Sequence, residues 1–433
     1  MFRQMIRQVY NAETYSLTGK IENIVGMSIE ASGGRAAVGD ICRIYNGDSG
    51  GQVTAEVVGF KNDHILLMPY SDMAGISAGN FVRNTGRQLT LRVGEFLRGR
   101  IINAMGQPID GKPPFEGGTP YCVGGSYINP LRRPPIRERM EFGVKAIDGM
   151  ITIGKGQRIG IFAGSGVGKS TLMGMIAKNV KADINVIALV GERGREVLEF
   201  VQKDLGEEGM RRSVLVVATS DQPAMLRMKC PSVATGIAEY FRDQGYDVLL
   251  MMDSLTRFAM AQREIGLAIG EPPVSRGYTP SMYAEMPKLL ERSGNFDRGS
   301  ITGVYTVLVE GDDTNEPIAD TVRGILDGHI VLSRALANSN HYPAIDVSAS
   351  ISRLMVEIVS KEHRQLASRL RDILSTYEKN ADLVAIGAYK PGTNRNLDYA
   401  LSKIDAVNGF LTQEIDEAFS YDECVEKLKQ ILN

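Results

Sequence analysis

Long apolar runs, cysteine and net charge are all scarce in this sequence, and each shortage excludes a class of protein. No stretch of the 433 residues approaches the roughly 18 consecutive apolar residues that a membrane-spanning helix needs. The first eight residues include basic side chains without an apolar run after them, so we expect no secretory signal. Lys and Arg number 49 against 51 Asp and Glu, and the resulting charge of −2 gives no overall attraction for nucleic acid or anionic lipid.

The cysteines are few and widely separated. The four of them lack the spacing of metal ligands, which favours unbridged, mostly buried thiols in a reducing cytosol. A content of 43% apolar and 23% charged residues is ordinary for a globular protein and excludes wholesale disorder. The length predicts two or three domains.

Three regions differ in their hydrophobic pattern and predict three domains of an α/β protein. Short alternating runs broken by glycine, at 21–25, 40–44, 53–58 and 65–68, predict a small N-terminal β-barrel over residues 1–92. In residues 93–360 continuous apolar runs alternate with helical patterns, as in a P-loop (RecA-like) domain with a mainly parallel sheet. Apolar stripes at helical spacing, which include Leu411 and Ile415, predict a C-terminal helical domain over residues 361–433.

The expected strands of the central domain are 159–162, 186–190, 214–218, 248–252 and 304–309. The first of them runs directly into a glycine-rich loop that is followed by a helical segment. Glycines let backbone N–H groups turn toward a phosphate, and a helix N-terminus adds partial positive charge. Lys169 would reach the terminal phosphates and the Ser170 hydroxyl would bind Mg²⁺. The residues expected to hold a nucleotide are Gly164, Ser165, Gly166, Val167, Gly168, Lys169, Ser170 and Thr171.

Acidic residues follow two other expected strands. Asp253 ends an apolar run and would hold Mg²⁺, through water, although a helix N-cap is the alternative. Glu192 follows the strand 186–190, where it could face the γ-phosphate and polarise an attacking water. Arg193 could steady phosphate charge. The alternative for Glu192 is a helix-start acid that pairs with the neighbouring arginines.

Several motifs together resemble the catalytic subunits of rotary ATP synthases and their export relatives. They are the phosphate loop, Gly-Glu-Arg-Gly-Arg-Glu at 191–196, Met-Met-Asp-Ser-Leu-Thr-Arg at 251–257 and the Pro-Ala-Ile-Asp signature within 341–353. The stretches 270–280, 289–294 and 311–333 are most similar to the flagellar type III export ATPase family, the flagellum-specific ATP synthases. The injectisome (virulence) export ATPases share most of these motifs and remain the alternative.

The resemblance implies ATP and Mg²⁺ as ligands and assigns roles by position. Glu192 matches the glutamate that activates water, and Tyr342 matches an aromatic that stacks on adenine, its alternative being a core tyrosine before a turn proline. Arg353 matches an arginine finger that reaches the γ-phosphate of a neighbouring subunit. Because one chain carries both Glu192 and Arg353, a homohexameric ring would have a complete site at every interface. Tyr389 is a further candidate to enclose the base.

The resemblance also implies a function, a set of partners and a location. The function is a Mg²⁺-dependent ATP hydrolase that energises export of flagellar proteins. The partners are export chaperones and their substrates, a membrane export gate contacted peripherally, and a regulatory stator-like protein at an N-terminal face made by Met5, Ile6, Val9 and Tyr10. The location is cytoplasmic, at the inner-membrane export apparatus.

Three other functions fit the sequence less well. A non-catalytic nucleotide-binding scaffold carries Gln where Glu192 stands. A nucleic-acid translocase would need a basic or aromatic platform, which the charge of −2 and the absence of a dense Lys/Arg run disfavour. A true synthase subunit would have an acidic lever-like run and a Phe-rich adenine pocket, where this chain has Ile-Gly-Ala-Tyr-Lys-Pro-Gly at 386–392.

Overall fold

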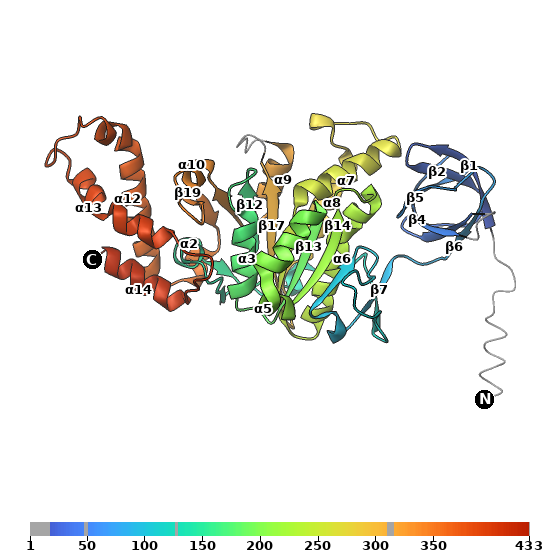
Figure 1. The fold of residues 1–433 in the computed structure, drawn as a ribbon, viewed down its shortest axis with the longest axis horizontal. Coiled ribbons are helices and arrows are strands. Elements are labelled where there is room, and N and C mark those ends of the chain that lie inside the picture. Colours follow the sequence, from blue (N-terminus) through green and yellow to red (C-terminus); the bar gives the residue numbers. More distant parts are fainter. Residues whose placement is uncertain (1–17, 47–50, 126–128, 310–315, 433) are drawn as a thin grey trace.

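The computed structural model describes residues 18–46, 51–125, 129–309 and 316–432. The molecule is elongated, with a β-barrel at one end, a sheet covered by helices in the middle and a group of helices at the other end (Figure 1). The three-part α/β architecture predicted from the sequence is confirmed. The expected N-terminal face at Met5 to Tyr10 lies outside the described residues. Among the helices described, none is both long and apolar enough to cross a membrane.

The N-terminal strands form a closed barrel in the order β1-β2-β5-β4-β3-β6. Its interior holds Ile21, Ala31, Cys42, Ile44 and Val57. Along β1, β2 and β3 the first four of these alternate with exposed or half-buried side chains. The four predicted runs correspond to β1, β3, β4 and β5, whereas β2 and β6 were not predicted. The strands are β1 (Thr18–Val25), β2 (Ser28–Ser32), β3 (Ile41–Tyr45), β4 (Gln52–Lys61), β5 (His64–Pro69) and β6 (Phe81–Asn84).

The central sheet has nine strands, eight of them in the order β19-β18-β12-β17-β15-β13-β14-β8 with β16 paired to β17. All five predicted strands are present as β12, β13, β14, β15 and β17, and they pair in parallel. The strands are β8 (Arg100–Asn103), β12 (Arg158–Ala163), β13 (Ile184–Glu192), β14 (Ser213–Thr219), β15 (Asp247–Asp253), β16 (Gly294–Asn295), β17 (Ser300–Leu308), β18 (Gly328–Leu332) and β19 (Ile345–Ser352). Two small sheets pair β7 (Thr90–Val93) with β9 (Thr119–Cys122) and β10 (Arg139–Met140) with β11 (Ile153–Gly154).

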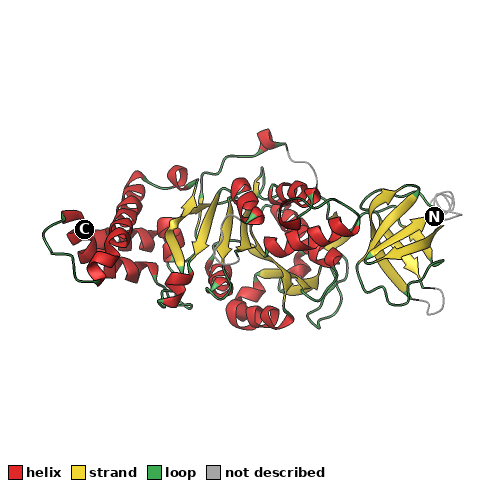
Figure 2. Ribbon diagram, turned by 90° about the horizontal axis from the view of Figure 1, so that it is seen from above, coloured by secondary structure: helices red, strands yellow, loops and turns green. Residues whose placement is uncertain are grey.

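Helices cover both faces of this sheet (Figure 2). Val186 and Val190 of β13 belong to one apolar core together with α6 and α7, while Ile187 and Leu189 belong to a second core together with α3. A strand with both faces buried needs apolar residues at every position, which explains the unbroken runs. The helices of this domain are α2 (Lys145–Met150), α3 (Lys169–Asn179), α4 (Gly194–Glu199), α5 (Gly206–Arg211), α6 (Ala224–Asp243), α7 (Leu255–Ala268), α8 (Pro280–Leu290), α9 (Pro317–Ile325), α10 (Arg334–Asn338) and α11 (Met355–Ile358), with a π-helical segment at Phe200–Leu205.

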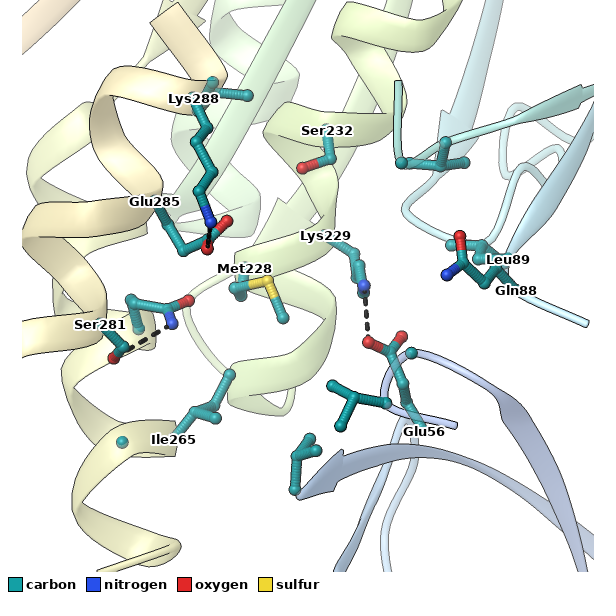
Figure 3. Close-up of a pocket in the computed structure, with 18 of the residues that line it drawn as sticks. Glu56, Gln88, Leu89, Met228, Lys229, Ser232, Ile265, Ser281, Glu285 and Lys288 are labelled. Atoms are coloured by element: carbon teal, nitrogen blue, oxygen red, sulfur yellow. Dashed lines mark hydrogen bonds and ion pairs between the residues drawn. The ribbon is translucent and has the colours of Figure 1, made fainter. Parts of the chain in front are cut away.

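The barrel meets the central domain around a cavity of about 430 Å³ (Figure 3). The buried carboxylate of Glu56 in β4 accepts a hydrogen bond from the Tyr70 hydroxyl and pairs with Lys229 of α6 at 2.7 Å. Glu285 and Lys288 of α8 form a second ion pair, at 2.7 Å, on the facing wall. Because removing one member of a buried pair leaves an uncompensated charge, Glu56 and Lys229 fix the barrel against α6.

The C-terminal helices α12 (Lys361–Ala385), α13 (Arg395–Leu411) and α14 (Tyr421–Leu432) bury the predicted apolar stripes. They fasten to α2, all six residues of which are buried. The buried His363 ring lies 2.6 Å from the Gly149 carbonyl oxygen and 2.9 Å from the Tyr421 hydroxyl. Arg371 donates to the Met150 carbonyl at 2.9 Å. The prediction that Ile415 continues the core stripe of α13 is wrong, because the helix ends at Leu411 and Ile415 is 50% exposed.

Candidate active site

The glycine-rich loop connects β12 to α3, as the sequence pattern predicts. Gly166 and Gly168 adopt φ values of +75° and +87°, a left-handed backbone that side-chain-bearing residues rarely adopt. Gly168 is the N-cap of α3, so the helix begins at Lys169 with its free N–H groups at the loop. A cavity of about 660 Å³ opens here, lined by residues 163–166 and 168–171 and by the ends of neighbouring strands. This arrangement suits an anionic ligand at the loop.

Three of the predicted residues meet at the carboxyl edge of the sheet. The ammonium of Lys169 binds Asp253 Oδ1 and lies 3.6 Å from Glu192 Oε1. These side chains come from the start of α3 and from the ends of β15 and β13, which are adjacent strands. Thr306 of β17 donates a hydrogen bond to Asp253 Oδ1 at 2.7 Å. The carboxyl ends of parallel strands therefore bring together residues that are up to 84 positions apart.

Burial raises the pKa of Glu192 to about 7, and the nearby charge of Asp253 acts in the same direction, while Lys169 opposes it. A carboxylate with a pKa near the working pH is well suited to accept a proton in a reaction. Asp253 is almost fully buried, and its paired neighbour Lys169 is mostly buried as well. The site therefore combines a fixed cation with a candidate proton acceptor.

The oxygen donors present fit a magnesium ion that is shared with a nucleotide. Within the described ranges, no cluster of three or more His, Cys, Asp or Glu side chains could hold a metal by itself. The Ser170 hydroxyl and the Asp253 carboxylate are hard oxygen donors at the edge of the phosphate loop. Mg²⁺ typically takes one or two protein ligands and completes its shell with water and phosphate oxygens, so this sparse donor set matches its preference.

Three arginines line this cavity, Arg193, Arg257 and Arg334, and the first two do so in different ways. Arg193 lines it, yet its side chain is 81% exposed and its guanidinium lies 3.7 Å from Glu196 of α4. Arg257 also lines the cavity, against Gly191, and sequence reasoning assigned it no role. Its Nε is buried without a hydrogen-bond partner in the described part of the chain. Arg257 lies four residues after Asp253, in the first turn of α7, and this position was the sequence signal that could have placed it at the site.

A second cavity of about 680 Å³ lies on the other side of the loop. Tyr342 lines it, and its ring approaches the position that a Cβ on Gly168 would take. Residues 412–415, just after α13, also line this cavity, and the sequence analysis did not place them at the site. Tyr389 lies elsewhere, in the turn between α12 and α13, where its hydroxyl donates to Asp398 Oδ1 at 2.9 Å. A flat aromatic ring beside the phosphate loop suits a nucleotide base.

Arg353 follows β19 and is exposed. Its guanidinium donates to the Arg323 carbonyl at 3.4 Å. Arg353 is not among the described residues that line the 660 Å³ cavity. Ile351 and Val356 beside it are 46% and 57% exposed. The structure therefore does not bring Arg353 to the phosphate loop of its own chain, and two exposed apolar side chains lie within three positions of it along the chain.

Three family models together match most of the chain. The nucleotide-binding domain of the ATP synthase alpha/beta family matches residues 143–352, and the β-barrel domain of the same family matches residues 21–86. The C-terminal domain of the T3SS EscN ATPase matches residues 359–430. The three matched regions coincide with the sheet domain, the barrel and the C-terminal helices.

Curated relatives match along nearly their whole length. A flagellum-specific ATP synthase of Bacillus subtilis is 55% identical over 430 residues, covering 99% of this chain and 98% of the relative. A type 3 secretion system ATPase of Xanthomonas euvesicatoria is 48% identical over 413 residues, covering 95% and 93%. Among solved structures, the assembled ATPase EscN of the enteropathogenic E. coli type III secretion system superposes with a TM-score of 0.91 at 45% identity, covering 96% of this chain and 100% of that one. EscN in complex with its central stalk EscO gives a TM-score of 0.89 at 44% identity, with the same coverage of both chains.

Proposed function

Because the chain belongs to the ATP synthase alpha/beta family, in the group of flagellum-specific ATP synthases and type 3 secretion system ATPases, we propose that it is a Mg²⁺-dependent ATP hydrolase that energises export of flagellar proteins. The observation that carries this proposal is the meeting of Lys169, Asp253 and Glu192 at the phosphate loop. A scaffold subunit would not need a buried carboxylate with a raised pKa at that point.

Each residue at the loop has a chemical task in this proposal. Lys169 and the loop N–H groups bind the β- and γ-phosphates, and Glu192 orients a water and accepts its proton as the water oxygen attacks the γ-phosphorus. The bond to the β-phosphate oxygen breaks, and ADP leaves with that oxygen. Ser170, and Asp253 through water, would hold Mg²⁺, which would supply positive charge to the phosphates. Arg193 and Arg257, which line the same cavity, add positive charge near the phosphates.

The arginine finger comes from a second copy of the chain in this proposal. Arg353 is exposed on a surface with uncovered apolar side chains, and it lies away from its own phosphate loop. A head-to-tail contact that repeats and closes gives a ring, so we infer a homohexamer with one site at each interface. The similarity to EscN, solved in an assembled form, supports such an arrangement.

The cellular role follows the relatives. We infer a location at the cytoplasmic face of the inner-membrane export apparatus and contacts with an export gate, with export chaperones and their substrates, and with a stator-like regulator at the N-terminus, but not with nucleic acid. The 55% identity to a flagellum-specific ATP synthase favours flagellar export. The alternative, an injectisome ATPase, is supported by the 48% identity to a type 3 secretion system ATPase. A deletion strain scored for motility and for secretion of hook and filament proteins decides between them.

The catalytic proposal is tested with Glu192→Gln. This substitution keeps the shape of the side chain and removes its ability to accept a proton, so ATP binding persists while turnover falls by about 10²- to 10⁴-fold. Glu199→Gln, the same change at a partly exposed position of α4, is the matched control and keeps full activity. Undiminished hydrolysis by Glu192→Gln removes Glu192 from the catalytic role.

A further inference from the structure

Gln413 stands between the C-terminal helices and the second cavity. It follows α13 and is 6% exposed. Its backbone N–H donates to the Tyr342 carbonyl at 2.9 Å. Its side-chain Oε1 accepts from the backbone N–H of Lys145 at 2.8 Å, and its Nε2 donates to the carbonyls of Gly143 at 2.9 Å and Glu417 at 2.8 Å. One residue therefore links Tyr342, the start of α2 and the segment 412–417.

The amide of Gln413 has no donor left for a ligand. An amide side chain has two N–H donors, and both are taken by backbone carbonyls. Although Gln413 lines the cavity with Tyr342, it cannot donate a hydrogen bond to the edge of a base. Its contribution to nucleotide binding is consequently indirect, through the groups that it holds.

The groups that it holds belong to the cavity lining or lie beside it. Its backbone N–H binds the Tyr342 carbonyl, and its side chain ties the 412–417 segment to the start of α2; Tyr342 and residues 412–415 all line the cavity. Lys145 adds a second tie between α2 and the end of α13, because its ammonium donates to the Gly409 carbonyl at 3.3 Å and lies 4.9 Å from the ring centroid of Phe419. Removing the Gln413 amide would leave the buried N–H of Lys145 without its partner. The carbonyls of Gly143 and Glu417 would keep only longer bonds, from the Phe419 N–H at 3.3 Å and the Asn179 amide at 3.5 Å, so the 412–417 segment would shift.

We propose that Gln413 is a positioning residue for the nucleotide base: it sets the spacing between Tyr342 and the 412–417 segment, and so sets nucleotide affinity without touching the ligand. This inference rests on the proposed function and on the expected stacking of Tyr342 on the base. Stacking on an aromatic ring tolerates any base. Loss of Gln413 therefore weakens binding of ATP and GTP by the same factor, whereas loss of a group that reads the base edge would change their ratio.

The chain contains no tryptophan, so Tyr342→Trp creates a single fluorescent reporter at the site. In that parent, titration with ADP and Mg²⁺ gives a direct Kd. Adding Gln413→Met keeps the length of the side chain and the backbone bond to Tyr342 but removes the side-chain hydrogen bonds. It raises this Kd about tenfold, the effect of roughly one lost buried hydrogen bond. Gln430→Met, the same change at an exposed position of α14, leaves the Kd unchanged.

Steady-state kinetics in the chain that retains Tyr342 supply the second readout. Gln413→Met raises the KM for ATP and for GTP equally, and kcat stays within about threefold, because the phosphate site is untouched. An unchanged Kd in a folded Gln413→Met protein overturns the inference and leaves the ATPase proposal intact. A changed ratio of the two KM values overturns positioning in favour of direct contact with the base.

Two further outcomes separate this inference from the proposed function. If the fluorescence emission of the Tyr342→Trp parent does not change on addition of ADP, the base site is overturned and this inference with it. A parent that binds ADP with the expected dependence on Gln413 but does not turn over ATP supports this inference and overturns the catalytic proposal alone. Should Gln413→Met fail to show a cooperative thermal transition, Gln413→Glu keeps the acceptor for Lys145 and loses both donors. An unchanged ADP Kd in that variant overturns the inference equally.

Discussion

Arg353→Ala tests whether catalysis is shared between two chains. The Arg353 side chain is exposed and makes one long hydrogen bond, at 3.4 Å, while its backbone N–H to Asp327 survives the substitution. The free energy of unfolding therefore changes by less than about 0.5 kcal/mol. If the guanidinium stabilises transition-state charge across an interface, kcat nevertheless falls by about 10³- to 10⁵-fold. An effect this large from an exposed residue is explained by a partner chain, not by lost stability.

Mixing variants makes the test specific for an interface. In a closed ring, a site needs Glu192 from one chain and Arg353 from the next. When Glu192→Gln and Arg353→Ala chains are mixed in equal amounts, random assembly makes about one quarter of the interfaces complete, so the mixture regains about one quarter of full activity. Each variant alone stays inactive, because every one of its interfaces lacks one group.

The assay is phosphate release from ATP by the two purified variants, separately and after co-assembly. Arg364→Ala, which removes another exposed arginine, is the matched control and keeps full activity. A mixture that is no more active than the sum of its components would refute the shared-site reasoning. Full activity of Arg353→Ala alone would refute the finger itself.

Three further predictions concern stability and metal dependence. Gly174→Ala in α3 destabilises the fold by about 1–3 kcal/mol, because its Cβ would lie 2.7 Å from the Cβ of Asp204. Gly324→Ala in α9 meets nothing within 4 Å and stabilises the fold by about 0.5–1 kcal/mol. Equal shifts of the two variants in thermal unfolding would contradict this prediction. Burial lowers the pKa of His363 from 6.5, so below that pH the unfolded chain binds a proton that the folded chain does not, and stability falls. Denaturant titrations of His363→Gln at several pH values should show a shallower pH dependence, and an unchanged slope would count against it. Chelation of divalent cations abolishes hydrolysis and added Mg²⁺ restores it; turnover that persists with chelator would exclude a metal role for Ser170 and Asp253.

The sequence predicted the parts of the site that local pattern determines. The strands with both faces buried, such as β13, appear as unbroken apolar runs, and the phosphate loop between a strand and a helix predicted where Lys169 lies. The roles of Glu192 and Arg353, and the domain boundaries at residues 92 and 360, stay predictions.

What the sequence could not reveal are contacts between distant segments. Gln413 and Lys145 are 268 positions apart, and no spacing rule relates them. The strand β2, Ser-Ile-Glu-Ala-Ser, is too short and polar to give a clear alternating pattern. Ile415 fits the helical spacing of the apolar residues in α13, but the helix ends at Leu411. Nothing in the local sequence shows that the segment turns toward Tyr342 there, so the prediction extended the stripe too far.

The buried helix α2 has a consequence for exchanging parts between relatives. His363, Arg371 and Gln413 all fasten to it, although it precedes them by more than two hundred positions. A chimaera that exchanges only the C-terminal helices would therefore lose their contacts with α2. The exchanged part must include its own version of residues 143–150. The exchangeable unit of this molecule is discontinuous along the chain.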